Sequence, residues 1–223
     1  MSFAVEAVLF DFGETLFSRG DGPQAVVDLA RERGVEVDLA RAGELWDEIQ
    51  SRGRSPEEMA KGRDLSASAH RACWTALYAL ADVLAGGVGE ALYEREISPA
   101  GWTPVPDAEP TLRALRRAAV PVGVVSDAGW DIRPVFAHHG LLELVDAFVL
   151  SYEHGAVKPA PGLFAAGSSA LGVTPEQTLV VGDNALADGG AVDAGLPVLL
   201  LPVAEPGRPR GLDAVLRLLG PPG

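Results

Sequence analysis

Polar side chains follow four apolar runs of this sequence, each close to the point where the run ends. Asp11 comes directly after the first run, and Ser126 and Asp127 end the second. Lys158 lies in the loop after the third run, and Asp183 follows the fourth. A carboxylate is ionised at neutral pH, while a lysine supplies a local positive charge. Brought together with a hydroxyl and a further acid, these residue types predict a site that carries out chemistry.

The apolar runs have the length and composition of buried strands, and helical patterns separate them. The predicted strands cover residues 4–11, 121–126, 147–151, 178–182 and 197–201. The predicted helices cover residues 107–118, 131–139, 162–171, 188–194 and 211–219. Apolar strands that alternate with helices predict an α/β fold with a parallel sheet covered on both faces and right-handed connections. Because ligands bind beyond the carboxyl ends of such strands, we expect the polar residues to converge there.

The interval between the first and second strands is different, because it contains helical patterns and no convincing strand. Helices are predicted over residues 24–33, 38–50, 65–85 and 89–97, and a capping box with proline in the first turn begins at Ser55. His70, Cys73, Trp74 and Tyr78 share a pattern typical of helix packing. The proline-rich segment 98–106 is predicted to be the hinge that returns the chain to the sheet.

Composition narrows the possible partners and compartment. The chain has 223 residues, 48% of them hydrophobic, and its formal net charge of −13 argues against nucleic acid or an anionic membrane as a partner. One cysteine, Cys73, excludes an internal disulfide, and Glu6 precedes any basic residue, unlike the start of a secretory signal. We therefore expect a cytoplasmic protein. Monomer and homodimer both stay open.

Four short motifs, in this order along the chain, resemble those of the haloacid dehalogenase-like (HAD) hydrolase superfamily. They are Asp11-Phe12-Gly13-Glu14-Thr15-Leu16, Val125-Ser126-Asp127, Val157-Lys158-Pro159 and Val181-Gly182-Asp183-Asn184-Ala185-Leu186-Ala187-Asp188. The resemblance covers almost the whole chain. It implies a Rossmann-like parallel-sheet core formed by residues 1–16 and 102–223, and an inserted all-helical cap of the C1 type formed by residues 17–101.

The resemblance also implies a metal-dependent reaction, because most members of the superfamily hydrolyse phosphate monoesters through an aspartyl-phosphate. Asp11 matches the nucleophile of that reaction. Mg²⁺ would neutralise charge as this carboxylate approaches a phosphate dianion. The expected metal ligands are the Asp11 carboxylate, the carbonyl of Gly13 and Asp183, with Asp188 acting directly or through water.

Further positions match residues that handle the phosphoryl group. Ser126 and Asp127, together with a backbone N–H at the strand-to-helix turn, match the phosphate-binding motif. Lys158 would contact both the phosphate and Asp11 and limit repulsion among the acids. Thr15 is expected to fix the geometry of the catalytic loop. The implied substrates are small phosphorylated metabolites, and their identity is left open.

Gly13 is the departure from the phosphatase pattern Asp-x-Asp-x-Thr. The second Asp of that pattern protonates the leaving group and then activates water, and here its side chain is missing. General acid–base catalysis contributes about 10²–10⁴ in rate, so this loss predicts slow turnover. The effect should be smallest for good leaving groups and largest for breakdown of the phospho-enzyme, where water needs a base. The neighbouring Glu14 has two interpretations, either a substitute acid/base or a solvated acid at the base of the cap.

Two other functions stay open beside the phosphatase. The 2-haloacid dehalogenases of the superfamily also lack the second acid, but they are metal-free and do not keep the acids of the fourth motif. The presence of Asp183 and Asp188 therefore favours a divalent cation over carbon–halogen cleavage. The other alternative is a catalytically inactive protein that binds phosphate or a partner without turnover.

Overall fold

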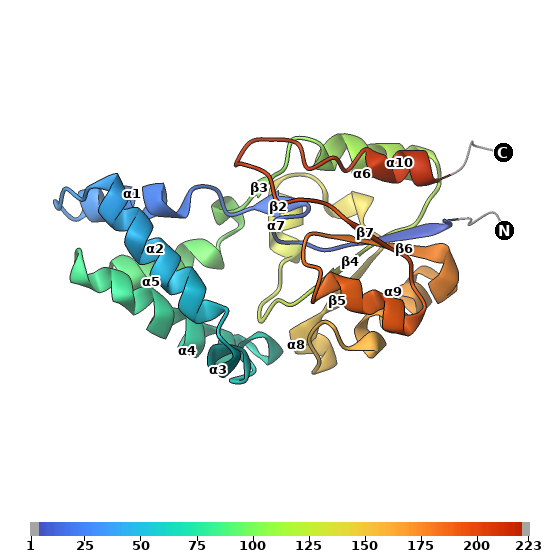
Figure 1. Cartoon of the computed structure of the whole chain (residues 1–223). Coiled ribbons are helices and arrows are strands. Elements are labelled where there is room, and N and C mark those ends of the chain that lie inside the picture. Colours follow the sequence, from blue (N-terminus) through green and yellow to red (C-terminus); the bar gives the residue numbers. More distant parts are fainter. Residues whose placement is uncertain (1–4, 220–223) are drawn as a thin grey trace.

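The computed structural model describes residues 5–219, and its centre is a parallel sheet of five strands (Figure 1). The strand order is β5-β4-β1-β6-β7. The strands are β1 (Ala7–Phe10), β4 (Val122–Ser126), β5 (Ala147–Leu150), β6 (Thr178–Gly182) and β7 (Val198–Leu200). All five predicted strands are confirmed, in a parallel α/β fold. Residues 1–4 and 220–223, which belong to the predicted core, lie outside the described part of the chain.

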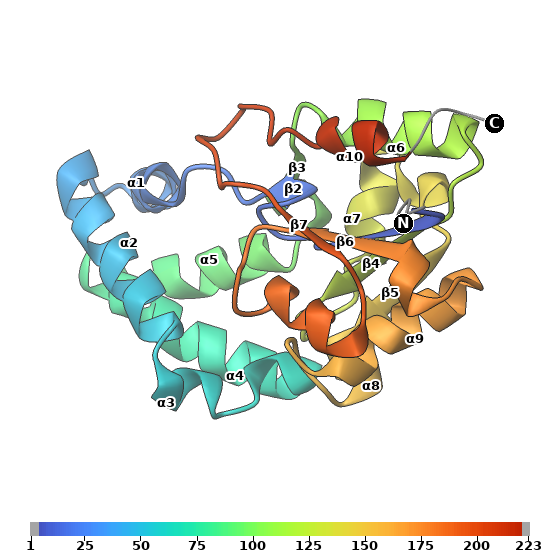
Figure 2. The same ribbon diagram turned by 45° about the vertical axis from the view of Figure 1, so that its right-hand side comes forward.

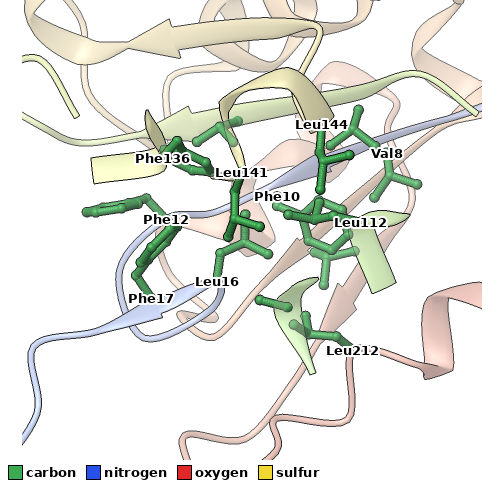
Figure 3. Close-up of a cluster of buried hydrophobic side chains, with 14 of the residues drawn as sticks. Val8, Phe10, Phe12, Leu16, Phe17, Leu112, Phe136, Leu141, Leu144 and Leu212 are labelled. Atoms are coloured by element: carbon green, nitrogen blue, oxygen red, sulfur yellow. The ribbon is translucent and has the colours of Figure 1, made fainter. Parts of the chain in front are cut away.

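Successive side chains of each strand point to opposite sides of the sheet, and an apolar cluster lies on each side. Val8 and Phe10 lie in one apolar cluster, on the side covered by α6 (Ala108–Arg117), α7 (Arg133–His138) and α10 (Ala214–Leu218). Figure 3 shows this cluster, which includes Phe10 of β1 and Leu112 of α6. Leu9 lies in the opposite cluster, against α9 (Pro161–Leu171) and the 3₁₀ helix η6 (Asp188–Ala194). The two layers hold the strand ends rigidly.

Most predicted core helices are confirmed, with shorter bounds at residues 133–138 and 214–218. Residues 188–194 were predicted as an α-helix but form the tighter η6, which contains the adjacent glycines Gly189 and Gly190. A Cβ on Gly190 would lie 2.2 Å from Cβ of Pro159, so this glycine permits close packing. The prediction missed α8 (Ser151–His154), a single turn ended by Gly155 in the left-handed region. Among residues 5–219, no helix is both long and apolar enough to cross a bilayer.

Short 3₁₀ turns also connect these core elements. They are η4 (Leu142–Leu144) before β5 and η5 (Pro175–Gln177) before β6. Thr174 precedes η5. Its hydroxyl donates to Oε1 of Gln177, and its backbone carbonyl accepts a bond from the hydroxyl of Thr178, so the turn leads directly into the strand. These turns fix where the two strands begin.

The segment between β1 and β4 is helical, as predicted, and it has an apolar core of its own. Its helices are α1 (Gly22–Glu32), α2 (Leu39–Gly53), α3 (Pro56–Met59), α4 (Ala67–Tyr78) and α5 (Val88–Glu96), with the 3₁₀ turns η1 (Arg63–Leu65), η2 (Ala79–Val83) and η3 (Pro99–Gly101). Asp21, Asp38, Ser55 and Ser66 cap α1 to α4 through their side chains. The predicted helix 65–85 divides at Tyr78 into α4 and η2.

A two-stranded antiparallel ribbon, which the sequence analysis missed, joins these helices to the sheet. It pairs β2 (Phe17–Ser18) with β3 (Thr103–Pro104). We name residues 19–102 between these strands the helical module. Figures 1 and 2 show the module beside the end of the sheet toward which β1 runs. The hydroxyl of Ser151 also joins the two parts, since it donates to the carbonyls of Asp64 in the module and Ala128 in the core. The predicted division at residues 16/17 and 101/102 stays a prediction.

Candidate active site

Three neighbouring strands bring the predicted site residues to one edge of the sheet. Because β4, β1 and β6 are adjacent, Ser126, Asp11 and Asp183 leave the sheet side by side. The backbone N–H of Asp11 donates to the carbonyl of Val181 at 2.8 Å, so the sheet ladder continues up to the acid. The structure therefore brings together residues that lie up to 172 positions apart in the sequence.

Lys158 is the centre of this site. Its side chain is only 4% exposed, and Nζ donates to Oδ1 of Asp11 and to Oδ1 of Asp188, both at 2.6 Å. Its backbone N–H donates to Oδ1 of Asp127 at 2.8 Å. Lys158 thus connects its loop to residues that follow three different strands, β1, β4 and β6. One ammonium group bridges two of the predicted metal-binding acids.

Thr15 and Gly182 fix the acids on either side of Lys158. The hydroxyl of Thr15 lies 3.2 Å from Oδ2 of Asp11 and 3.4 Å from Oδ1 of Asp183, so it links β1 and β6. Asp188 is fully buried, and its Oδ2 accepts the backbone N–H of Asn184 at 3.0 Å. A Cβ on Gly182 would lie 2.2 Å from that same oxygen. A glycine is therefore required where Asp188 approaches the end of β6.

The electrostatics of the site favour an added cation. Burial raises the pKa of the Asp11 carboxyl to about 7, against the opposing positive charge of Lys158. Asp188 and Asp183 act in the same direction as burial. Burial would lower the pKa of Lys158, but Asp11 and Asp188 outweigh it and the net shift is upward. The ammonium stays charged, yet it faces more than one carboxylate. A further positive charge would relieve their repulsion and keep Asp11 ionised.

The donor set fits a hard divalent cation. Asp11, Asp183 and Asp188 each offer a carboxylate oxygen, and these three atoms lie within 4.8 Å of one another. Mg²⁺ prefers such oxygen ligands and keeps several waters, so it needs only one or two carboxylates from the protein. Asp11 and Asp188 each accept a bond from Lys158, whereas the only side-chain contact of the Asp183 carboxylate in this group is with Thr15, so Asp183 has the freest oxygen atoms.

The phosphate-binding positions of the sequence analysis also face the site. Ser126 is buried and lines the pocket, and its hydroxyl makes no hydrogen bond to any other described residue. Asp127 lines the same pocket, and burial raises its pKa to about 6. The turn between β4 and the next helix is longer than predicted, because α7 begins at Arg133 and not at residue 131.

Gly13 lies beside an aromatic wall rather than beside open solvent. A Cβ added to Gly13 would lie 3.7 Å from Cζ3 of Trp102, an ordinary van der Waals contact. Trp102 is 5% exposed, its ring centroid lies 4.5 Å from that of Phe12, and its Nε1 donates to the carbonyl of Glu96 at 2.7 Å. The position tolerates a side chain, and Trp102 forms the surface that this side chain would meet.

The interpretation of Glu14 as a solvated acid is wrong. Its Oε2 lies 2.5 Å from Nη2 of Arg210, whose side chain is only 2% exposed, and the Glu14 side chain is 30% exposed. Arg210 also donates to the carbonyl of Ala204, and the Arg210 backbone N–H donates to Asp107. The segment after β7 is thereby tied to the catalytic loop. Nothing in the sequence analysis signalled this contact, because the two residues lie 196 positions apart.

Glu14 also has an unusual backbone conformation. Its φ is 59°, in the left-handed region that favours glycine, and glycine is the residue that the superfamily commonly has there. Its N–H donates to the carbonyl of Phe17 at 2.6 Å, which closes the catalytic loop. The ion pair with Arg210 and this hydrogen bond stabilise a conformation that is costly for a side-chain-bearing residue.

A pocket of about 260 Å³ lies over these residues, and the helical module supplies its other wall. The module contributes Arg19, Arg54, Arg63, Asp64, His70, Trp74 and Glu96, while the core contributes the acids and Trp130. The sequence analysis assigned His70 and Trp74 to packing; both are buried, and both also face the pocket. It missed the arginines. Their only signal was composition, since two of the 18 basic residues are lysines.

His70 gives a test of how the module is packed. Its Nδ1 lies 3.2 Å from the hydroxyl of Tyr93, and burial lowers its pKa to about 4. An unfolded histidine has a pKa near about 6.5, so the unfolded chain binds more protons between these values and stability is lost as the pH falls. We expect wild type to lose about 2 kcal/mol more unfolding free energy than His70→Gln between pH 7.5 and 4.5. Urea unfolding at both pH values measures this difference. Equal losses in the two proteins would contradict it.

Comparison with known proteins agrees with this fold and site. The haloacid dehalogenase-like hydrolase family matches residues 5–194, and the chain belongs to that family of hydrolases. It is 30% identical over 131 residues to mouse haloacid dehalogenase-like hydrolase domain-containing protein 3, a match that covers 58% of this chain and 50% of the mouse protein. It is 28% identical over 210 residues to ribulose-1,5-bisphosphate 5-phosphatase of Halopiger xanaduensis, covering 89% of this chain and 85% of that protein.

Solved structures include relatives of both chemical kinds. A HAD phosphatase from Thermococcus onnurineus is 26% identical with a TM-score of 0.64, covering 97% of this chain and 98% of that one. The L-2-haloacid dehalogenase from Xanthobacter autotrophicus is 25% identical with a TM-score of 0.60, covering 88% of this chain and 77% of that one. The fold is therefore shared with enzymes that act on phosphate esters and with enzymes that act on haloacids.

Proposed function

We propose that this hydrolase cleaves small phosphate monoesters through a covalent phosphoryl group on Asp11. The observation that supports this most is the arrangement of Asp11 with Lys158 and two further carboxylates, whose excess negative charge an added cation would offset. Similarity to a HAD phosphatase and to a ribulose-1,5-bisphosphate 5-phosphatase points in the same direction. The pocket of about 260 Å³ is at the small end for ligand sites, so the substrate is a small molecule.

The reaction divides into two transfers. A carboxylate oxygen of Asp11 attacks phosphorus, the bond from phosphorus to the ester oxygen breaks, and the leaving alkoxide takes a proton from water to become the alcohol. Water then attacks the phosphorus of the acyl phosphate, which releases inorganic phosphate and restores the carboxylate. Lys158 orients Asp11 and offsets negative charge, and the free hydroxyl of Ser126 is placed to donate to a phosphoryl oxygen.

Mg²⁺ is the proposed cofactor. Asp11, Asp183 and the carbonyl of Gly13 would hold it, with Asp188 acting directly or through water. When bound, the ion offsets the negative charge of both the carboxylates and the phosphoryl group. Residues 17–101 are proposed to act as a C1-type cap, since the pocket has one wall on the module and one on the core.

One assay separates this function from its alternatives. Purified protein is incubated with p-nitrophenyl phosphate or with 2-chloropropionate, each with Mg²⁺ or with EDTA. We expect phosphate release that needs Mg²⁺, and no chloride release. Chloride release without metal would instead indicate a dehalogenase. Neither product, from a folded protein, would indicate a binding protein without turnover.

The missing acid at position 13 leads to a prediction about leaving groups. Gly13→Asp restores the side chain that protonates the leaving alcohol, and the structure accommodates its Cβ against Trp102. We expect kcat for an alkyl phosphate to rise about 10- to 100-fold, with a smaller change for p-nitrophenyl phosphate, whose leaving group needs no proton. Gly13→Asn is the matched control, because it has the same shape and no acid. An equal rise in both variants, or a fall in Gly13→Asp, would contradict the role assigned to the missing acid.

A further inference from the structure

The module wall of the pocket carries arginine N–H donors that no described residue uses. Arg19 is paired with Glu96 at 3.2 Å, so its charge is offset inside the protein. The guanidinium of Arg54 makes no hydrogen bond or ion pair to any residue in the range 5–219, although it lines the pocket. The charge of Arg63 is also offset, by the ion pair of its Nε with Asp64 at 3.2 Å, and its Nη1 donates to the carbonyl of Gly53; its Nη2 has no partner in that range.

Arg63 is held in a fixed orientation. Its side chain is 12% exposed, and its guanidinium carbon lies 4.7 Å from the centroid of the Trp74 ring. That stacking and the two hydrogen bonds fix the plane of the guanidinium group. Little side-chain entropy is therefore lost when a ligand accepts a hydrogen bond from the free Nη2. A rigid guanidinium with one open edge is suited to an oxyanion.

Arg54 and Arg63 are neighbours in space, because Arg63 donates to the carbonyl of Gly53, the residue before Arg54. Arg63 also lies against the loop that follows β4. A Cβ on Gly129 would lie 2.9 Å from the Arg63 carbonyl oxygen, and Ser126, the last residue of β4, directly precedes the same loop. The two arginines therefore share one pocket with Asp11, on the wall that the module supplies.

We propose that Arg54 and Arg63 form a second anion subsite, so that the enzyme selects small phosphate monoesters whose far end carries an oxyanion. This proposal rests on the proposed function and names its substrate class. A carboxylate and a second phosphate share the required chemistry. The acids at the sheet edge, together with a metal ion, act on the phosphoryl group that is transferred. The arginines bind the oxyanion at the far end of the substrate and need no metal to do so.

Two probes of equal chain length test the selection. They are n-propyl phosphate and 3-phosphonooxypropionate, which differ in a terminal methyl or carboxylate group. We expect kcat/KM of wild type to favour the carboxylate probe at least 10-fold, since a charge-assisted contact supplies about 10- to 100-fold. Arg54→Gln and Arg63→Lys are each expected to reduce this ratio at least threefold, mainly through KM. Arg52→Gln is the matched control, because Arg52 pairs with Glu48 on the surface of α2 and does not line the pocket.

A binding measurement distinguishes failure of the anion-subsite proposal from failure of the proposed phosphatase function. Calorimetry with Asp11→Asn and Mg²⁺ compares the Kd of the two probes without turnover, and the same arginine substitutions are then added. Tighter binding of the carboxylate probe that needs both arginines supports the subsite, even if neither probe is hydrolysed. Equal binding of the two probes, binding of neither, or a preference that survives both substitutions would overturn it. Because the Arg63 side chain is largely buried, circular dichroism is used to check that Arg63→Lys is folded.

Discussion

Asp11→Asn is expected to lower kcat/KM for any phosphate monoester by about 10⁴-fold or more, because an amide does not form the acyl phosphate. The variant should fold, since the asparagine has the same shape and Oδ1 remains an acceptor for Lys158. It also removes one of the carboxylates that crowd the site, so its free energy of unfolding without metal should not fall. Phosphate release under saturating Mg²⁺ and urea unfolding measure the two effects.

Asp47→Asn is the control for that experiment. Asp47 is exposed on α2, so the variant makes the same change of charge away from the pocket. It should keep wild-type turnover. Activity in Asp11→Asn within a factor of ten of wild type, with deamidation excluded by mass spectrometry, would remove Asp11 from the role of nucleophile.

Lys158→Met is expected to damage both stability and activity. The substitution keeps the length of the side chain but leaves Asp11 and Asp188 as two buried carboxylates, each without its bond of 2.6 Å to the ammonium. Breaking a buried pair in this way costs about 3–5 kcal/mol. We expect that loss in the free energy of unfolding measured in EDTA, and a fall in kcat/KM of about 10²–10³-fold with Mg²⁺ present.

Two further variants make this result specific. Adding Asp188→Asn to Lys158→Met removes one of the unpaired charges, and part of the lost stability should return. Arg113→Met breaks the ion pair with Glu109 on the surface of α6, where both side chains are 52% exposed, and it should leave stability nearly unchanged. A double variant less stable than Lys158→Met would contradict the account of buried like charges.

The sequence predicted the sheet edge well because its signals are local. Each strand is a short apolar run, and each polar residue of the site directly follows a strand or lies in the next loop. Once the strands are parallel, the convergence of Asp11, Ser126 and Asp183 follows from the fold alone. The bounds of α4 and η6 were less predictable, because packing against neighbouring elements decides between an α-helix and a 3₁₀ turn.

The other side of the site was not predictable because it depends on contacts between distant segments. The ion pair of Glu14 with Arg210 requires the path of the chain after β7, and no local pattern specifies that path. The arginines of the module lie on short turns and helix ends, where a charged residue is ordinarily a surface residue. Their place in the pocket depends on how the module docks against the core, as at the contact of the Ser151 hydroxyl with the carbonyl of Asp64.

A crystal structure grown with Mg²⁺ and beryllofluoride tests the central proposal most directly. Beryllofluoride mimics a phosphoryl group on a carboxylate, so we expect beryllium bonded to a carboxylate oxygen of Asp11. We also expect one Mg²⁺ held by Asp11, Asp183 and the carbonyl of Gly13, and Lys158 still bonded to Asp11. Well-defined density in which Asp11 stays unmodified, or in which the divalent ion binds away from Asp11 and Asp183, would contradict the mechanism.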